Sequence, residues 1–147
     1  MYRSIAVIAV LALATPAAAD DWTLVTQEDF ARESAAPQIA MSFAQAPNGP
    51  QIEVVHPELS KTITTPITIE LRWQPKDQAS IDMSSFRATY GWMGLDITSK
   101  IRENAQITQE GLLAKGAKLP TGTHRVTVQI ADNLKRVGAR TFEFTVQ

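Results

Sequence analysis

Alternation of apolar and polar residues between Pro50 and Gln147 predicts a series of β-strands. In the clearest run every second residue is apolar, and the apolar set is Ile67, Ile69, Leu71 and Trp73. Successive side chains of a strand point to opposite faces, so this run indicates a strand with one buried and one solvated face. Comparable runs predict strands at 52–54, 67–73, 86–90, 95–97, 105–108, 126–130 and 142–146.

About seven strands at this spacing, without the 3.6-residue period of helices, predict an all-β fold. The expected architecture is an antiparallel β-sandwich with a short, partly helical N-terminal extension. Two stretches do not alternate. Ile81–Ser85 predicts a short helical or irregular turn, and Gly111–Lys118 predicts a loop or a ragged strand.

The stretch Leu119–Val146 predicts the hairpin that closes the sandwich. Its first four residues place proline second and glycine fourth, which is typical of a type I turn. Two alternating strands then flank a polar loop from Asp132 to Gly138. Because the loops of a sandwich gather at its ends, this loop is a candidate binding site.

Basic residues in and beside this loop suggest a partner. Lys135 and Arg136 lie within it and Arg140 follows shortly after. A contact with an acidic partner is one interpretation, and a solvated loop tip is the other.

Residues 1–19 have the three parts of a secretory signal peptide. Arg3 precedes an apolar run from Ile5 to Leu13, and small residues follow at Ala17–Ala19. The run is shorter than the roughly 20 residues of a membrane span. We therefore expect cleavage between Ala19 and Asp20, a periplasmic or secreted mature protein, and no stable membrane insertion.

Composition narrows the function further. The 147 residues include no cysteine, which excludes disulfides, thiolate metal ligands and a cysteine nucleophile. The formal net charge is −1, and residues 50–147 carry about +2; so weak a positive balance argues against nucleic acid or an anionic membrane as the main partner. Acidic residues concentrate in residues 20–49, which we interpret as an extension preceding a domain at 50–147.

Within this extension, Thr26 followed by Glu28 and Asp29 predicts the start of a short helix that Pro37 would end. Residues 38–49 predict a linker with a turn at its end. The extension also carries large apolar side chains: Trp22, Leu24, Val25 and Phe30. These either dock on the domain surface or recognise a partner.

Several segments share the strand and turn chemistry of one family. They are Pro66–Ile69, Ile81–Phe86, Leu119–Val128, Asp132-Asn133 and Thr141–Val146. With them, the sequence from Pro50 to Gln147 resembles the bacterial immunoglobulin-like domains of exported and surface proteins. The resemblance implies a sandwich used as a non-catalytic module for spacing, docking or binding. The cysteine pair of antibody domains is absent here.

His56 and His124 are the two histidines and weak candidates for a metal site. His124 alternates in phase with Val126 and Val128, which favours a structural histidine facing inward. A metal site normally needs three or four donors, and two histidines do not supply them.

Copper is the alternative, since imidazole and thioether ligands select it and the chain has Met41, Met83 and Met93. Periplasmic copper proteins of the CopC type resemble the predicted fold. Their ligating histidine lies at the mature N-terminus, however, where this chain has Asp20.

Acidic residues in predicted turns or at strand ends are Asp77, Asp82, Asp96 and Asp132, with Asn133 beside the last. Calcium takes six to eight oxygen ligands. Asp and Asn also favour turns through local hydrogen bonds, and we interpret these residues in that way.

Trp92 lies in a predicted bend between Gly91 and Gly94 and is the candidate to stack against a carbohydrate. Trp73 and Tyr90 alternate in phase with core residues, which predicts that both lie inside the sandwich.

Clustered acid pairs, glycine-rich phosphate loops and serine elbows do not occur in the sequence, so we predict no catalytic residue, no cofactor and no enzyme activity. We expect a module that docks a protein of the cell envelope. The alternative is a small-ligand protein that binds copper or a carbohydrate. The predicted binding residues are Lys135, Arg136, Arg140 and Trp92.

Overall fold

The computed structural model describes residues 21–39 and 46–147, so the predicted signal peptide lies outside the described residues. The described part contains ten strands and two helices. In chain order they are β1 (Trp22–Thr23), α1 (Gln27–Ser34), β2 (Gln51–His56), β3 (Thr62–Ile63), β4 (Ile67–Gln74), β5 (Ile81–Tyr90), β6 (Leu95–Asp96), α2 (Thr98–Asn104), β7 (Ala105–Ile107), β8 (Gly111–Lys118), β9 (Gly122–Asp132) and β10 (Val137–Val146).

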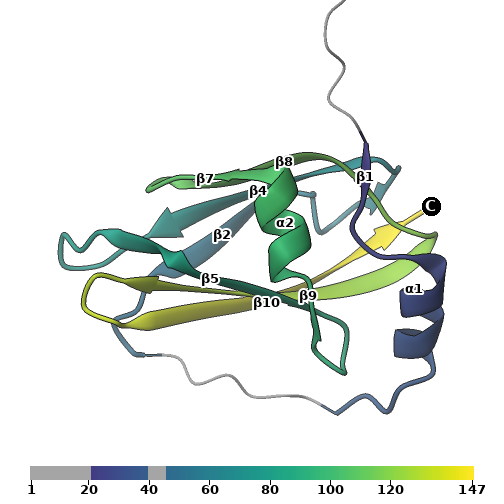
Figure 1. The fold of residues 1–147 in the computed structure, drawn as a ribbon, viewed down its shortest axis with the longest axis horizontal. Helices are drawn as coiled ribbons and strands as arrows, with labels where there is room; N and C mark the ends of the chain where they lie inside the picture. Colours follow the sequence, from purple (N-terminus) through teal and green to yellow (C-terminus); the bar gives the residue numbers. More distant parts are fainter. Residues whose placement is uncertain (1–20, 40–45) are drawn as a thin grey trace, which may run out of the picture.

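The strands form two five-stranded sheets that face each other (Figure 1). In the first, β8 pairs with β4 and β4 with β2, while β7 and β1 share the other side of β8. The second has the order β3-β10-β9-β5-β6. The all-β fold is confirmed. The expectation of purely antiparallel sheets is wrong, because β1 runs parallel to β8 and β3 parallel to β10.

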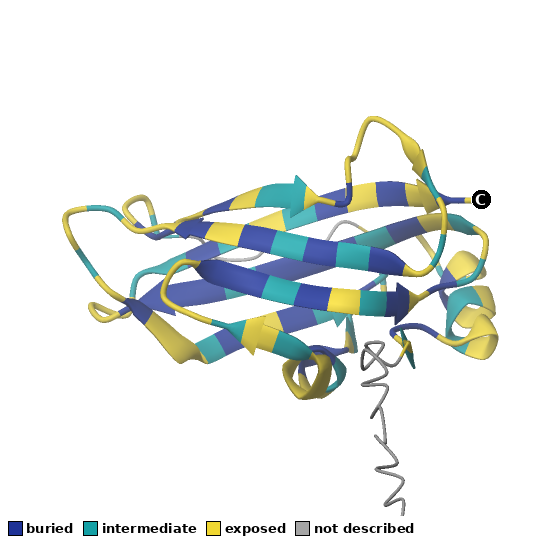
Figure 2. Cartoon of the chain, turned by 90° about the horizontal axis from the view of Figure 1, so that it is seen from above, coloured by how far each residue is buried: buried dark blue, intermediate teal, exposed yellow. Residues whose placement is uncertain are grey.

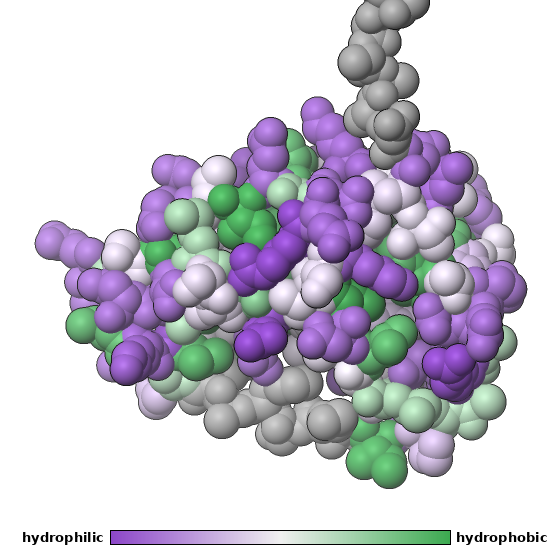
Figure 3. Space-filling model, in the orientation of Figure 1, coloured by the Kyte–Doolittle hydropathy of each residue, from purple (hydrophilic) through white to green (hydrophobic). Residues whose placement is uncertain are grey.

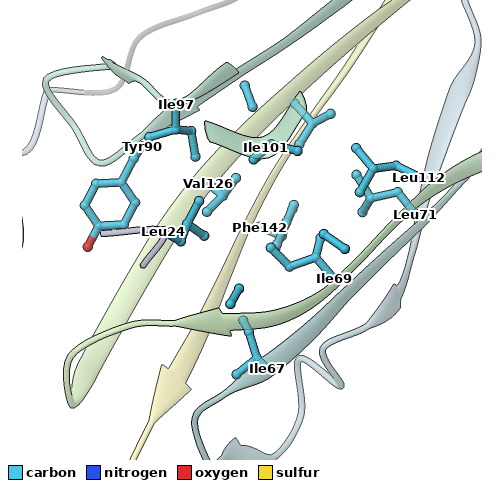
Figure 4. Packing of buried hydrophobic residues seen from close by; sticks show 14 of the residues in the cluster. Leu24, Ile67, Ile69, Leu71, Tyr90, Ile97, Ile101, Leu112, Val126 and Phe142 are labelled. Carbon is cyan, nitrogen blue, oxygen red and sulfur yellow. The ribbon is translucent and has the colours of Figure 1, made fainter. Parts of the chain in front are cut away.

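Side chains that point between the sheets make one core. Burial alternates residue by residue along β4, and Figure 2 shows the resulting bands of buried and exposed residues. In Figure 4, Leu71 and Leu112 of the first sheet lie across from Val126 and Phe142 of the second. Each such side chain contributes roughly 1.5–3 kcal/mol on burial, so the facing rows hold the sheets together.

The alternation also placed the large aromatic residues correctly. Trp73 and Tyr90 are 5% and 2% exposed. On the face that Figure 3 shows, polar residues dominate and apolar groups form small separate patches. Along β4 the polar residues Glu70, Arg72 and Gln74 are the more exposed ones, as the sequence predicts.

The turn predicted over Ile81–Ser85 is wrong, because β5 is a strand from Ile81 onward. Asp82 explains the error. Its Oδ1 accepts a hydrogen bond from the Ser84 backbone N–H (3.1 Å), and its carbonyl accepts one from the Ser85 hydroxyl (2.5 Å). These local bonds are turn chemistry placed inside a strand, and the register against β9 shifts there.

β8 resolves the alternatives left open for Gly111–Lys118, since it is a strand in the interior of the first sheet. Position 111 requires glycine, because the backbone of β4 lies so close that a Cβ there would be 2.0 Å from the Leu71 carbonyl oxygen. Ala114 and Ala117 are fully buried. Because alanine and glycine are small and only weakly apolar, the alternation along β8 is weak. Pairing with β4 on one side and with β7 and β1 on the other makes this segment a strand.

The strand count was too low: residues 50–147 hold nine strands rather than about seven, and the sequence also missed α2. α2 covers an edge of β5. One nitrogen of Arg102, Nη2, donates to three carbonyls of that edge, those of Met83, Ser84 and Phe86. A covered edge cannot pair with another chain. In the described ranges, neither helix has the length and apolar character needed to cross a bilayer.

The N-terminal extension docks on the sandwich. Leu24 and Val25 are 0% and 1% exposed, within the common core. The predicted helix start is confirmed, since the Thr26 hydroxyl accepts a hydrogen bond from the Asp29 N–H (3.1 Å). Of the two alternatives for these apolar residues, docking is what the structure shows.

Replacing Leu24 with alanine should therefore lower the free energy of unfolding by about 2–5 kcal/mol, as for other core leucines. Urea denaturation measures the change. Leu134→Ala is the matched control, because Leu134 is 62% exposed and its loss should cost less than about 0.5 kcal/mol. Equal effects at the two positions would show that the extension is not part of the core.

Candidate functional site

Two loops meet at one end of the sandwich: residues 75–80 between β4 and β5, and residues 133–136 between β9 and β10. We call this end the loop pole. The Asn133 N–H donates to the Ser80 carbonyl (2.9 Å), and the Ser80 N–H donates to Asn133 Oδ1 (3.1 Å). Gln109, from the neighbouring β7–β8 connection, bonds both backbone groups of Ile81. The loops are thus fixed to one another.

Asp132 organises the β9–β10 loop from beneath. Its Oδ1 accepts the backbone N–H groups of Leu134 and Arg136, each at 2.9 Å, and its Oδ2 accepts Arg136 Nε at 2.7 Å. Burial alone would raise the pKa of Asp132, but the hydrogen bonds from Arg136 and Leu134 outweigh it, and the pKa lies below its ordinary value. The carboxylate is therefore held charged.

Arg136 ties the two loops together. Its Nη1 donates to Asp77 Oδ2 (2.9 Å) and its Nη2 to the Lys76 carbonyl (3.2 Å), in addition to the Asp132 bond. Hydrogen bonds to Asp77 and Asp132 raise the pKa of Arg136 above its ordinary value. A guanidinium used in this way holds loop geometry, and only 19% of its side chain is exposed.

Backbone strain is concentrated at the loop pole. Among the described residues, the non-glycine positions with positive φ are Asp77 (55°), Gln78 (55°) and Lys135 (60°), and all three lie in these two loops. Such backbone conformations are costly and persist only where the surrounding structure enforces them. Next to Lys135, Leu134 is 62% exposed. The network therefore holds an apolar side chain and a lysine out in solvent.

The predicted basic residues do not form one patch. Lys135 is exposed at the tip of the loop, while Arg136 is engaged below it. Arg140 lies on β10 and its Nη1 donates to the Ile52 carbonyl (3.2 Å), at the side where β10 approaches β2. Binding by these residues stays a prediction.

Trp92 lies at the opposite end of the sandwich and is partly buried. The guanidinium carbon of Arg125 lies 3.9 Å from its ring centroid, a cation–π contact. Glu33 Oε2 of α1 accepts a hydrogen bond from the backbone N–H of Trp92 at 2.8 Å. Sequence reasoning missed the role of Glu33. The alternation places Arg125 and Glu143 on the polar faces of their strands, and the register of β9 against β10 makes them cross-strand partners.

His124 occupies the inward position that the alternation predicts, and it is fully buried. Its Nε2 lies 2.7 Å from the Pro120 carbonyl and its Nδ1 lies 2.8 Å from the Tyr90 hydroxyl. A carbonyl only accepts, so Nε2 carries the proton and Nδ1 accepts from Tyr90. Burial lowers the pKa of His124 and raises that of Tyr90. Phe30 of α1 covers the imidazole, with 5.0 Å between ring centroids.

His56 lies in the other sheet from His124, and its Nε2 is 4.0 Å from Glu70 Oε2. Across residues 21–39 and 46–147, no three His, Cys, Asp or Glu side chains are grouped to hold a metal ion. Met41, one of the predicted thioether donors, lies outside the described residues.

Comparisons with protein-family models, with curated proteins and with solved structures found no match to this chain. The function is therefore inferred from the geometry of the two ends of the sandwich.

Asp132→Asn should destabilise the protein at neutral pH, because Arg136 loses a charged acceptor. The pKa of Asp132 is lowered by folding, so its contribution is complete above the ordinary carboxyl range and is lost as the pH falls through the folded-state pKa. Denaturation of both proteins between pH 7 and about 3 should show their stabilities converging. Asp77 is another partner of Arg136, and its side chain is 70% exposed, so Asp77→Asn should lower the stability less than Asp132→Asn does. A difference independent of pH would contradict this role.

The lowered pKa of His124 predicts a loss of stability on acidification as well, but in a higher pH range than for Asp132. The unfolded chain takes up the proton first, so stability falls as the pH drops below about 6.5 and levels off below the folded-state pKa. Chemical denaturation from pH 8 to 5 measures this slope. His124→Gln should flatten it, because this substitution removes the buried titrating group. A slope that survives His124→Gln would assign it to another group.

Proposed function

We propose that this protein is an exported, immunoglobulin-like domain that docks a protein partner through the loop pole. It acts in the cell envelope after cleavage of residues 1–19 and needs neither a catalytic group nor a cofactor. The strand order, the chemistry of the loop pole and the signal-peptide pattern support this proposal.

Strand order supports the immunoglobulin type. In that fold one sheet has the order A-B-E-D and the other contains C-F-G, lettered along the chain. Here β2-β4-β8-β7 and β5-β9-β10 follow the same two orders when the short strands β1, β3 and β6 are left out and the other seven are lettered in sequence. His124 adds a local parallel. It lies near the start of β9 and bonds back to the Pro120 carbonyl, as the tyrosine of the immunoglobulin corner does.

The same lettering identifies the loops of the pole. The β4–β5 loop corresponds to B–C and the β9–β10 loop to F–G, two of the loops with which variable domains bind their targets. This position, on a rigid scaffold, is where binding residues are commonly found.

The observation that carries the proposal is the strained, cross-linked loop pole with Leu134 exposed at its tip. Strained backbone that is held by a dense hydrogen-bond network points to function rather than stability. Because the loops are already ordered, binding costs little conformational entropy. A partner of matching chemistry has an apolar pocket for Leu134 and acidic groups for Lys135.

The copper alternative gains nothing from the geometry. Both ring nitrogens of His124 are engaged, by Pro120 and Tyr90, and His56 lies in the other sheet.

A photo-crosslinking residue placed at position 134 tests the proposal in cells that express the full chain. We expect one discrete protein adduct, reduced at least about threefold by Lys135→Glu because the rim charge is reversed. Mass spectrometry identifies the adduct and gel densitometry gives its yield.

The matched control is the same photo-crosslinking residue at position 59. Leu59 is also exposed, but it lies in the connection between β2 and β3, outside the two loops of the pole. Equal adduct patterns at 134 and 59, or no adduct at 134, would reject the loop pole as the docking site.

A further inference from the structure

A cleft of about 710 Å³ lies at the end of the sandwich opposite the loop pole. Its walls come from α1, from the bend after β5, and from the adjoining parts of β9 and β10. Its lining includes Phe30, Glu33, Gln38, Trp92, Arg125 and Glu143. Sites for small molecules usually occupy 300–1,000 Å³ and combine aromatic side chains with a few fixed polar groups. The cleft meets both conditions.

Glu33 makes one wall rigid. Its Oε2 accepts the backbone N–H groups of Trp92 (2.8 Å) and Met93 (3.1 Å). A Cβ at Gly91 would lie 2.1 Å from the same oxygen, and the φ of Gly91 is 73°, so this approach requires glycine. The bend and α1 are thereby fastened together, and the cleft is formed without a ligand.

Arg125 and Glu143 supply a fixed donor and acceptor. Arg125 Nη1 donates to Glu143 Oε1 at 3.2 Å while its guanidinium stacks on Trp92. A guanidinium has five N–H donors, and within the described residues this is the one hydrogen bond its side chain makes. Glu143 is half exposed. Further donors of Arg125 and the second oxygen of Glu143 therefore remain for a ligand.

The charges argue against an ionic ligand. An anion would meet the carboxylates of Glu33 and Glu143, and an organic cation would meet Arg125. The described residues hold no metal-binding group of three His, Cys, Asp or Glu. A peptide added as a strand needs free backbone groups, whereas the N–H groups of residues 91–93 are already bonded.

We infer that this cleft binds a neutral saccharide. A sugar hydroxyl can accept a hydrogen bond from Arg125 and donate one to Glu143 at the same time. Phe30 and Trp92 offer aromatic surface to the apolar parts of a sugar ring. Gln38, which is exposed, adds an amide with both donor and acceptor. This binding is independent of docking at the loop pole.

Amide chemical shifts of the ¹⁵N-labelled protein test the inference during titration with maltotetraose, cellotetraose and N-acetylchitotetraose, each to about 20 mM. At least one should cause saturable shifts confined to residues 30–38, 91–94 and 122–125 and to Glu143. Glu143→Gln and Trp92→Leu should each weaken that binding about tenfold or more, with Glu143→Gln leaving the thermal unfolding midpoint unchanged.

The matched control is Glu58→Gln, which removes an exposed acid from its ion pair with Lys61; neither residue lines the cleft, so the affinity should not change. A tetra-alanine peptide and a tetragalacturonate serve as probes of the other ligand classes. The inference is overturned by absence of shifts with all three neutral sugars, by shifts elsewhere, by stronger binding of either other probe, or by unaltered affinity in Glu143→Gln.

Discussion

The antiparallel pairing of β9 with β5 and β10 is the interaction on which the rest of the structure depends. β9 is the longest strand and lies at the centre of its sheet. Its inward residues, from His124 to Ile130, face the other sheet and build the core. Its two ends also carry the chemistry, with Arg125 beside the cleft and Asp132 beneath the loop pole. A shift of one residue in this register would turn every one of these side chains to the wrong face.

The N-terminal extension is an integral part of the sandwich, to which it adds core residues and a strand. Leu24 and Val25 enter the core, and β1 adds to the first sheet beside β8. α1 then covers His124 with Phe30 and fastens the bend through Glu33. The cleft therefore exists only because the extension is docked, which links the shape of this end of the molecule to about fifteen residues that precede the sandwich in the chain.

The two ends of the sandwich differ in the way they satisfy their charged groups. At the loop pole, the side chains of Asp132 and Arg136 are engaged in hydrogen bonds that fix the loops. The side chains exposed to solvent there are Leu134 and Lys135. At the cleft, Arg125 is fixed by stacking but keeps donors to spare. The first arrangement suits a protein surface, where a few residues contribute most of the affinity. The second suits a small polar ligand.

Alternation alone determined the all-β fold, the inward set of β4, β9 and β10, and the burial of Trp73, Tyr90 and His124, because the two-residue period of a strand is a local property. Tertiary structure decided the rest. β8 became a strand through its neighbours, since its small residues carry little pattern of their own. Arg136 became a tie between loops, and Glu33 an anchor for a bend 59 residues away, through contacts that the sequence does not encode locally. Long-range hydrogen bonds depend on which segments the fold brings together, and that is settled only when both sheets have formed.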